Sequence, residues 1–253
     1  MKKRPIDYLI LVNPFHKIPE TYFDNLELVE MRGYDNERFR VEKSAAQQFR
    51  ELERATSAKG IPILLSSAYR SVEKQRQIKE EFTAEYGEDY AKRYVAEPGC
   101  SEHHTGLALD FVAKIRGKWL IENDEIISRA SELQPVYDLL PKYGFILRYL
   151  KGKEKITGYP AEPWHIRYLG DPEIAAEITA RRITLEEYCE QQSLSATRTG
   201  STTFTTTAPA GRRPPSSFRV FVAACAKNDI SFAFSSAYMC LSKPFILKNG
   251  LKT

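Results

Sequence analysis

The stretch Ser101-Glu-His-His-Thr-Gly-Leu-Ala-Leu-Asp110 sets two histidines ahead of a segment in which small or polar residues alternate with large apolar ones. In a strand over residues 106–112, Ala108 and Asp110 would share one face, because successive side chains point to opposite sides. The leucines and the phenylalanine between and beside them would form the other face. The stretch therefore predicts a strand with one face toward a core and a carboxylate on the other.

A second stretch, Glu162-Pro-Trp-His165, carries another of the four histidines. A catalytic zinc site uses three protein ligands and leaves a fourth position open, and His103, Asp110 and His165 can supply that set. His104 can replace His103 as a ligand, since spacing alone does not choose between neighbours. Because Asp110 would project from one strand and His165 from a later one, a sheet can bring them together.

Glu162 lies three positions before His165, so it can sit beside the ion without binding it. There it could take the proton of an attacking water and pass it to a leaving amine. Trp164 could form a wall of the pocket. No HExxH motif occurs, which excludes the arrangement in which two ligands share one helix.

Around these stretches the pattern predicts a mixture of helices and strands without regular alternation, which favours an α+β fold. We expect helices over residues 41–58 and 126–142, and strands over residues 8–12, 61–65, 145–150 and 164–169. Gly60 lies where the first helix would end, Ser71 can cap a further helix, and Thr184 begins a capping box for the last one.

The two motifs, Ser-x-His-x-x-Gly-x-Ala-x-Asp and Glu-Pro-Trp-His, resemble those of VanY-type D-alanyl-D-alanine carboxypeptidases and the related LD-carboxypeptidases, which are zinc peptidases that trim bacterial cell-wall peptides. The resemblance covers about residues 8–188. It implies a small antiparallel sheet flanked by helices, as in these peptidases and the Hedgehog signalling domain. It also implies that His103, Asp110 and His165 ligate zinc and that Glu162 is the general base.

The segment Ser66-Ser-Ala-Tyr-Arg70-Ser-Val-Glu-Lys-Gln75 is similar to the family's Ser-Gly-Tyr-Arg-Ser stretch, with alanine where glycine is usual. The resemblance implies that Arg70, Gln75, Ser101 and Tyr149 contact the substrate. An arginine can pair with a terminal carboxylate or stabilise a tetrahedral oxyanion, and the sequence does not choose between these roles.

The chain has 253 residues, of which 42% are hydrophobic and 28% charged, as is ordinary for a globular protein. Residues 1–188 hold 29 Lys and Arg against 31 Asp and Glu, so there is no basic surplus of the kind that marks a nucleic-acid binder. No run of about 18 apolar residues occurs, and no membrane span is expected. The sequence specifies no oligomeric state.

Residues 189–253 hold eight basic and two acidic residues, and residues 193–217 include twelve Ser or Thr. We therefore expect a zinc carboxypeptidase domain over residues 1–188 and a basic, low-complexity tail that is disordered over 189–253. The first apolar run covers only residues 8–12, whereas the core of a signal peptide needs roughly 7–15 residues. This predicts a cytoplasmic protein, with the cell envelope as the alternative, and cell fractionation tests it.

These observations lead to three hypotheses. The first is a zinc-dependent D,D-carboxypeptidase that removes the terminal D-alanine of peptidoglycan stem peptides or their precursors. The second is the same chemistry on another bond, as an L,D-carboxypeptidase, a dipeptidase or an endopeptidase. The third is a binding module stabilised by zinc, against which the presence of Glu162 argues.

Overall fold

The computed structural model describes residues 6–199, apart from the side chains of residues 90, 93 and 195–199. Its strands are β1 Leu28–Arg32, β2 Arg38–Glu42, β3 Ile63–Ser67, β4 Ala108–Ile115, β5 Lys118–Leu120, β6 Phe145–Tyr149 and β7 Glu162–Tyr168. Its α-helices are α1 Lys43–Ala58, α2 Val72–Tyr86, α3 Glu88–Tyr94, α4 Asn123–Ser128, α5 Gln134–Tyr137, α6 Glu154–Thr157, α7 Pro172–Arg181 and α8 Leu185–Thr199. Short 3-10 turns are η1 Glu20–Asn25, η2 Tyr34–Asn36, η3 Glu102–Thr105, η4 Ala130–Leu133 and η5 Pro141–Tyr143. The predicted α+β class is confirmed.

The central element is an antiparallel sheet in the order β3-β4-β7-β6, with β5 paired to β4. The register between β4 and β7 places Asp110 opposite His165 and Ala108 opposite Arg167. A separate hairpin, β1-β2, is tied to the loop before β4 by the bond from Glu42 N to Gly106 O, at 3.0 Å. The sheet therefore joins the two sequence motifs at neighbouring positions.

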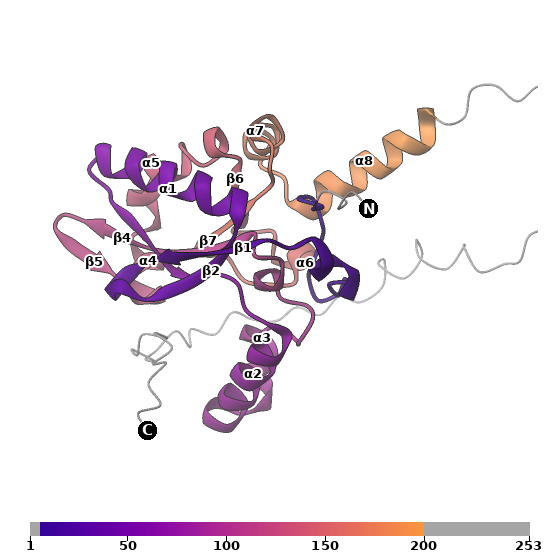
Figure 1. Cartoon of the computed structure of the whole chain (residues 1–253), viewed down its shortest axis with the longest axis horizontal. Helices are drawn as coiled ribbons and strands as arrows, with labels where there is room; N and C mark the ends of the chain where they lie inside the picture. The colour runs from indigo at the N-terminus through magenta and orange to yellow at the C-terminus, as the bar shows by residue number, and fades with distance from the viewer. Residues whose placement is uncertain (1–5, 200–253) are drawn as a thin grey trace, which may run out of the picture.

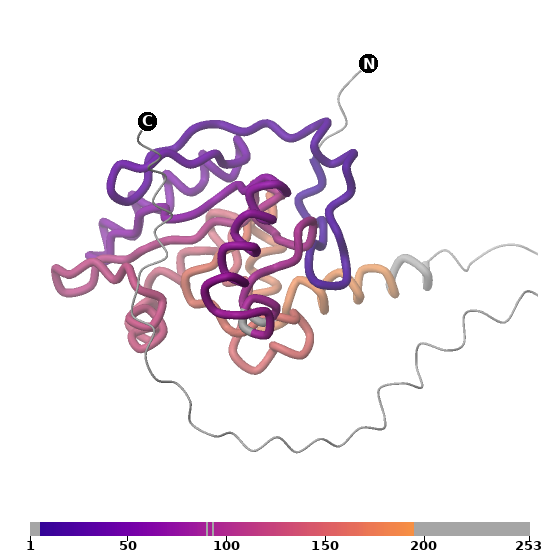
Figure 2. Tube along the Cα trace, turned by 90° about the horizontal axis from the view of Figure 1, so that it is seen from below, coloured from indigo at the N-terminus to yellow at the C-terminus, as the bar shows by residue number. Residues whose placement is uncertain are grey.

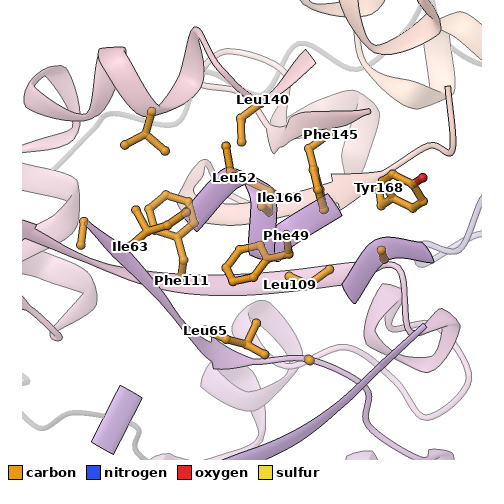
Figure 3. Close-up of a cluster of buried hydrophobic side chains, with 14 of the residues drawn as sticks. Phe49, Leu52, Ile63, Leu65, Leu109, Phe111, Leu140, Phe145, Ile166 and Tyr168 are labelled. Atoms are coloured by element: carbon orange, nitrogen blue, oxygen red, sulfur yellow. The ribbon is translucent and has the colours of Figure 1, made fainter. Parts of the chain in front are cut away.

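Helix α1 covers the apolar face of this sheet. Its buried side chains include Phe49 and Leu52, which recur at helical spacing. They pack with Leu109, Phe111 and Phe145 in the main core, as Figure 3 shows. The alternation predicted from the sequence thus places β4 against the core.

Helices α2 and α3 lie on the other side of the strands from α1 (Figure 1), and the view from below shows this pair in front of the strands (Figure 2). Ser71 caps α2 by accepting a hydrogen bond from Lys74 N, as predicted. Arg70 lies in the segment just before α2, and Gln75 lies in the first turn of α2. The polar side of the sheet therefore faces the segment that the sequence linked to substrate binding.

Two predicted elements are wrong. Residues 126–142 form short helices and 3-10 turns, and Pro135 and Pro141, which lack the N–H groups that a continuous helix requires, lie in the first turns of α5 and η5. Residues 8–12 form no strand. The carbonyl groups of Tyr8 and Ile10 instead accept hydrogen bonds from Arg167 Nη2, at 3.0 and 2.8 Å.

The capping box at Thr184 is confirmed: Thr184 N donates to Glu187 Oε2 at 2.8 Å, and Glu187 N donates to Thr184 Oγ1 at 3.2 Å. The helix it starts, α8, continues past residue 188, where we expected the domain to end. Most of the predicted tail, residues 200–253, lies outside the described residues. Within residues 6–199, no helix combines the length and apolar character that crossing a membrane would require.

Candidate active site

Three candidate ligands meet on the polar face of the sheet. Asp110 on β4 and His165 on β7 are register partners, and η3 supplies His103 just before β4. Gly106 makes the turn between η3 and β4 with φ of 71°. A Cβ there would lie 2.9 Å from Leu28 Cδ2, so the turn needs glycine for both its conformation and its space.

The three side chains converge closely. His103 Nε2 lies 3.3 Å from Asp110 Oδ2, and His165 Nδ1 lies 3.0 Å from Asp110 Oδ1. One ligand atom from each residue falls within 4.8 Å of the other two. The imidazole rings stand nearly perpendicular, at 88°, with centroids 5.0 Å apart. This is a compact set of two nitrogens and one carboxylate.

The two histidines present different nitrogens to the cluster. His103 Nδ1 lies 2.7 Å from Ala68 O, and a carbonyl only accepts, so Nδ1 carries the proton and Nε2 is free to bind a metal. In His165 the nitrogen that faces Asp110 is Nδ1, so Nε2 must carry its proton when a metal is bound.

The cluster fits a divalent cation. Within residues 6–199, Asp110 Oδ1 is buried and has no hydrogen-bond partner, although His165 Nδ1 lies 3.0 Å away. A short distance without hydrogen-bond alignment is typical of two lone pairs that point to a shared ion. Two imidazoles and a carboxylate match the three protein ligands of a catalytic zinc site.

Burial and neighbouring charges shift the pKa values of the cluster. Burial, with the charge of Arg70, lowers the pKa of His103 to about 4 and keeps this ring neutral. Burial would also lower the pKa of His165, but the carboxylates of Asp110 and Glu102 raise it to about 9. A bound cation would take the place of the proton that these carboxylates favour.

Glu162 begins β7 and lies beside this cluster, with Oε2 3.5 Å from His165 Nδ1. Burial raises the pKa of Glu162 to about 7, which suits a group that accepts and returns a proton near neutral pH. The charge of Arg70 acts on both Glu162 and Asp110. Within residues 6–199, Arg70 Nε is a buried donor without a hydrogen-bond partner.

His104 lies outside the cluster. Its Nδ1 is 2.7 Å from Arg70 O, and its Nε2 accepts a hydrogen bond from Gly99 N at 3.0 Å. Both ring nitrogens are therefore used to hold backbone in place. The choice between His103 and His104, which spacing left open, is made by the tertiary structure.

The residues predicted to bind the substrate lie in different surroundings. The ring of Tyr149 lies 4.8 Å from that of His165, and Ser101 is buried just before η3. Gln75 is buried and donates to Ala96 O at 2.9 Å, while its Oε1 has no partner among the described residues. Trp164 instead packs against the apolar core, because it precedes His165 in a strand and points to the opposite face.

Sequence reasoning missed two groups beside the cluster. Tyr159 packs against Tyr149, with ring centroids 5.4 Å apart, and no motif marked this loop residue. Glu102 is completely buried, and its Oε2 lies 3.5 Å from His165 Nε2. Its position between Ser101 and His103 in the sequence motif could have marked Glu102 as a residue close to the metal ligands.

Comparisons with known proteins agree with this geometry. The family model for VanY, D-alanyl-D-alanine carboxypeptidase, matches residues 38–171. The bifunctional D-Ala-D-Ala dipeptidase and D-Ala-D-Ala carboxypeptidase VanXYC of Enterococcus gallinarum is 41% identical over 152 residues, which make up 58% of this chain and 76% of that protein.

Two solved structures are also similar. The LD-carboxypeptidase LdcB is 36% identical with a TM-score of 0.62, over 71% of this chain and 84% of LdcB. The vancomycin resistance D,D-pentapeptidase VanY, in complex with Zn(II), is 34% identical with a TM-score of 0.57, over 72% of this chain and 98% of VanY. From the motifs, the fold and these matches, we conclude that the chain belongs to the VanY family of D-alanyl-D-alanine carboxypeptidases.

Proposed function

We propose that this protein is a zinc-dependent D-alanyl-D-alanine carboxypeptidase acting on peptidoglycan stem peptides or their precursors. The observation that carries the proposal is the convergence of His103, Asp110 and His165 beside the carboxylate of Glu162. The VanY relative that binds Zn(II) supports the choice of metal.

Bound zinc would polarise the scissile carbonyl and make a neighbouring water more acidic. Glu162 takes a proton from the attacking water at a carboxylate oxygen. The water oxygen adds to the carbonyl carbon, the C–N bond breaks, and Glu162 returns the proton to the amine of the departing D-alanine. His103 and His165 stay neutral ligands throughout.

Arg70 is the cation available to the substrate. Its guanidinium group could pair with the terminal carboxylate of D-alanine, or with the oxygen that becomes negative during attack. Tyr149 would pack along the substrate next to His165. Gln75 is buried, and its Oε1, which has no partner among residues 6–199, could accept a hydrogen bond from a substrate N–H only if the substrate reached that depth. Ser101 would lie at the peptide end.

Release of D-alanine from a defined pentapeptide, with and without a chelator, tests the proposal together with metal analysis. Glu162→Gln should lower turnover about a hundredfold to ten-thousandfold, the usual contribution of a general base, while zinc content stays unchanged. Glu190→Gln, at an exposed position on α8, is the matched control. Full D-alanine release by Glu162→Gln at normal zinc loading would refute the assignment of the base.

The similarity to LdcB favours a second candidate, an L,D-carboxypeptidase that removes D-alanine from a tetrapeptide. The two activities use the same metal chemistry and differ in the residue that precedes the cleaved bond. Mass spectra after digestion of defined tetrapeptide and pentapeptide muropeptides would separate them. Cleavage of the tetrapeptide alone would assign the L,D activity.

A further inference from the structure

A network of buried charges lies behind His165, on the side away from the metal cluster. Glu102 Oε1 accepts hydrogen bonds from Arg148 Nε at 2.7 Å and from Arg167 Nη1 at 2.8 Å. The side chains of these three residues are completely buried. One carboxylate oxygen therefore receives both guanidinium groups, which leaves the other oxygen for a different partner.

That second oxygen faces His165. Glu102 Oε2 and His165 Nε2 lie 3.5 Å apart, and both are buried atoms without a hydrogen-bond partner among residues 6–199. Since Nδ1 of the same ring faces Asp110, the proton of a metal-bound His165 belongs on Nε2. The carboxylate of Glu102 is placed to accept that proton.

The network reaches the C-terminal helix. Arg148 donates two hydrogen bonds to Glu186 on α8, from Nη1 to Oε2 at 2.8 Å and from Nη2 to Oε1 at 2.6 Å. Asn13 Nδ2 donates to the same carboxylate at 3.1 Å. Helix α8 thus holds Arg148, which in turn holds Glu102.

Stability alone does not account for this arrangement. Burying ionised groups is costly, and well-packed apolar side chains of similar size stabilise a fold as well or better. The network contains two arginines and two glutamates, so its formal charges balance. A carboxylate held rigidly against a metal ligand is a recognised way to fix the orientation of an imidazole and to strengthen its binding.

We propose that Glu102 is the positioning residue for His165, and that helix α8 keeps Glu102 in place through Glu186 and Arg148. This inference deepens the proposed function, since it rests on a metal bound by His103, Asp110 and His165. Glu102 acts through His165 and does not touch the substrate.

Glu102→Gln tests the inference with almost no change in shape. A carboxylate can accept from the arginines with one oxygen and from His165 with the other, whereas an amide has only one acceptor oxygen. We expect the affinity for Zn²⁺, measured by competition with a chromophoric chelator, to fall about 10- to 100-fold. The visible spectrum of the Co²⁺-loaded protein should change as well, because the orientation of one ligand changes.

Glu186→Gln tests the role of helix α8 and leaves Glu102 intact. We expect Zn²⁺ affinity to fall about threefold to tenfold, because the effect passes through Arg148. Glu190→Gln, on an exposed position of the same helix, should bind Zn²⁺ like the unmodified chain. If Glu102→Gln does not fold, as judged by circular dichroism, Glu102→Asp replaces it in the same comparison, because the shorter carboxylate cannot reach both the arginines and His165.

Zn²⁺ affinity and a Co²⁺ spectrum of Glu102→Gln equal to those of Glu190→Gln would overturn the positioning role. Equal affinities of Glu186→Gln and Glu190→Gln would overturn the role of helix α8. D-alanine release is measured separately. If the unmodified chain binds Zn²⁺ but releases no D-alanine, the proposed function fails while the order of affinities still decides the role of Glu102.

Discussion

The two faces of the central sheet are both buried, but they are held by different forces. On one face, Leu109 and Phe111 pack against α1 in the apolar core (Figure 3). On the other face, Asp110, His165 and Arg167 lie among ion pairs and hydrogen bonds. Successive residues of β4 therefore point alternately into the apolar core and into the polar cluster.

This difference suggests that the apolar face mainly sets folding stability and the polar face mainly sets metal binding. Apolar packing is non-directional and scales with buried area, whereas a metal site and its supporting charges require particular atoms at particular distances. Changes on the apolar face should lower the free energy of unfolding and leave metal affinity intact. Changes to the metal-binding residues of the polar face should lower metal affinity, whatever they do to stability.

The largest effect is expected at Asp110, which approaches both histidines. Asp110→Asn removes the charged ligand, and D-alanine release should fall about a thousandfold or more, since several kcal/mol of transition-state stabilisation depend on the metal. Kinetics and zinc analysis of the purified variant check this. A variant that keeps its zinc and is within tenfold of normal turnover would contradict the assignment.

On the opposite face of the same strand, Phe111→Ala should lower the free energy of unfolding by about 3–5 kcal/mol, because it leaves a cavity in the core. Urea unfolding measures this change. Zn²⁺ affinity of the folded variant should match that of the unmodified chain. Weakened zinc binding in a folded Phe111→Ala protein would mean that the two faces are not independent.

His104→Ala sharpens the comparison within the polar face. It leaves Arg70 O and Gly99 N without their partner, at a cost of about 1–3 kcal/mol of stability. Zn²⁺ affinity should not change, whereas KM or kcat should worsen as Arg70 loosens. His103→Ala should lose zinc. If His104→Ala loses zinc as well, the two histidines are not divided between structure and metal binding in this way.

The smallest effect concerns a carboxyl on α1, Glu53. Burial raises its pKa to about 7, despite the opposing charges of Arg50 and Arg54. By contrast, Arg148 and Arg167 overcome burial and hold the pKa of Glu102 well below its usual range. Glu53 therefore favours the protonated form in the folded state, and the stability it contributes below about pH 4.5 is lost as the pH rises through about 7.

Glu53→Gln should consequently be more stable than the unmodified chain at pH 8, by about 1 kcal/mol after allowance for solvent screening, and equally stable at pH 4. Urea unfolding at the two pH values measures this. Glu51→Gln, at a solvent-exposed position two residues earlier on α1, is the control variant. Equal stabilities of Glu53→Gln and the unmodified chain at pH 8 would contradict the raised pKa.

Local signals in the sequence predicted many elements correctly. The apolar spacing of α1, the Ser71 cap of α2 and the Thr184 capping box each depend on residues within a few positions of one another. The strand predicted over residues 8–12 is wrong because the conformation there depends on a contact distant in sequence. Their apolar residues pack beside a long-range contact, in which Arg167 takes the carbonyl groups that a strand would have used.

The sequence by itself determined the chemistry of the candidate ligands and the alternation that puts Asp110 on the polar face. The family resemblance already implied His103 as a ligand, but only the tertiary structure showed that His104 holds backbone and that Glu102 stands behind His165. The physical reason is that periodicity fixes the direction of a side chain within its own element. The partner it meets depends on the register between strands that lie more than fifty residues apart.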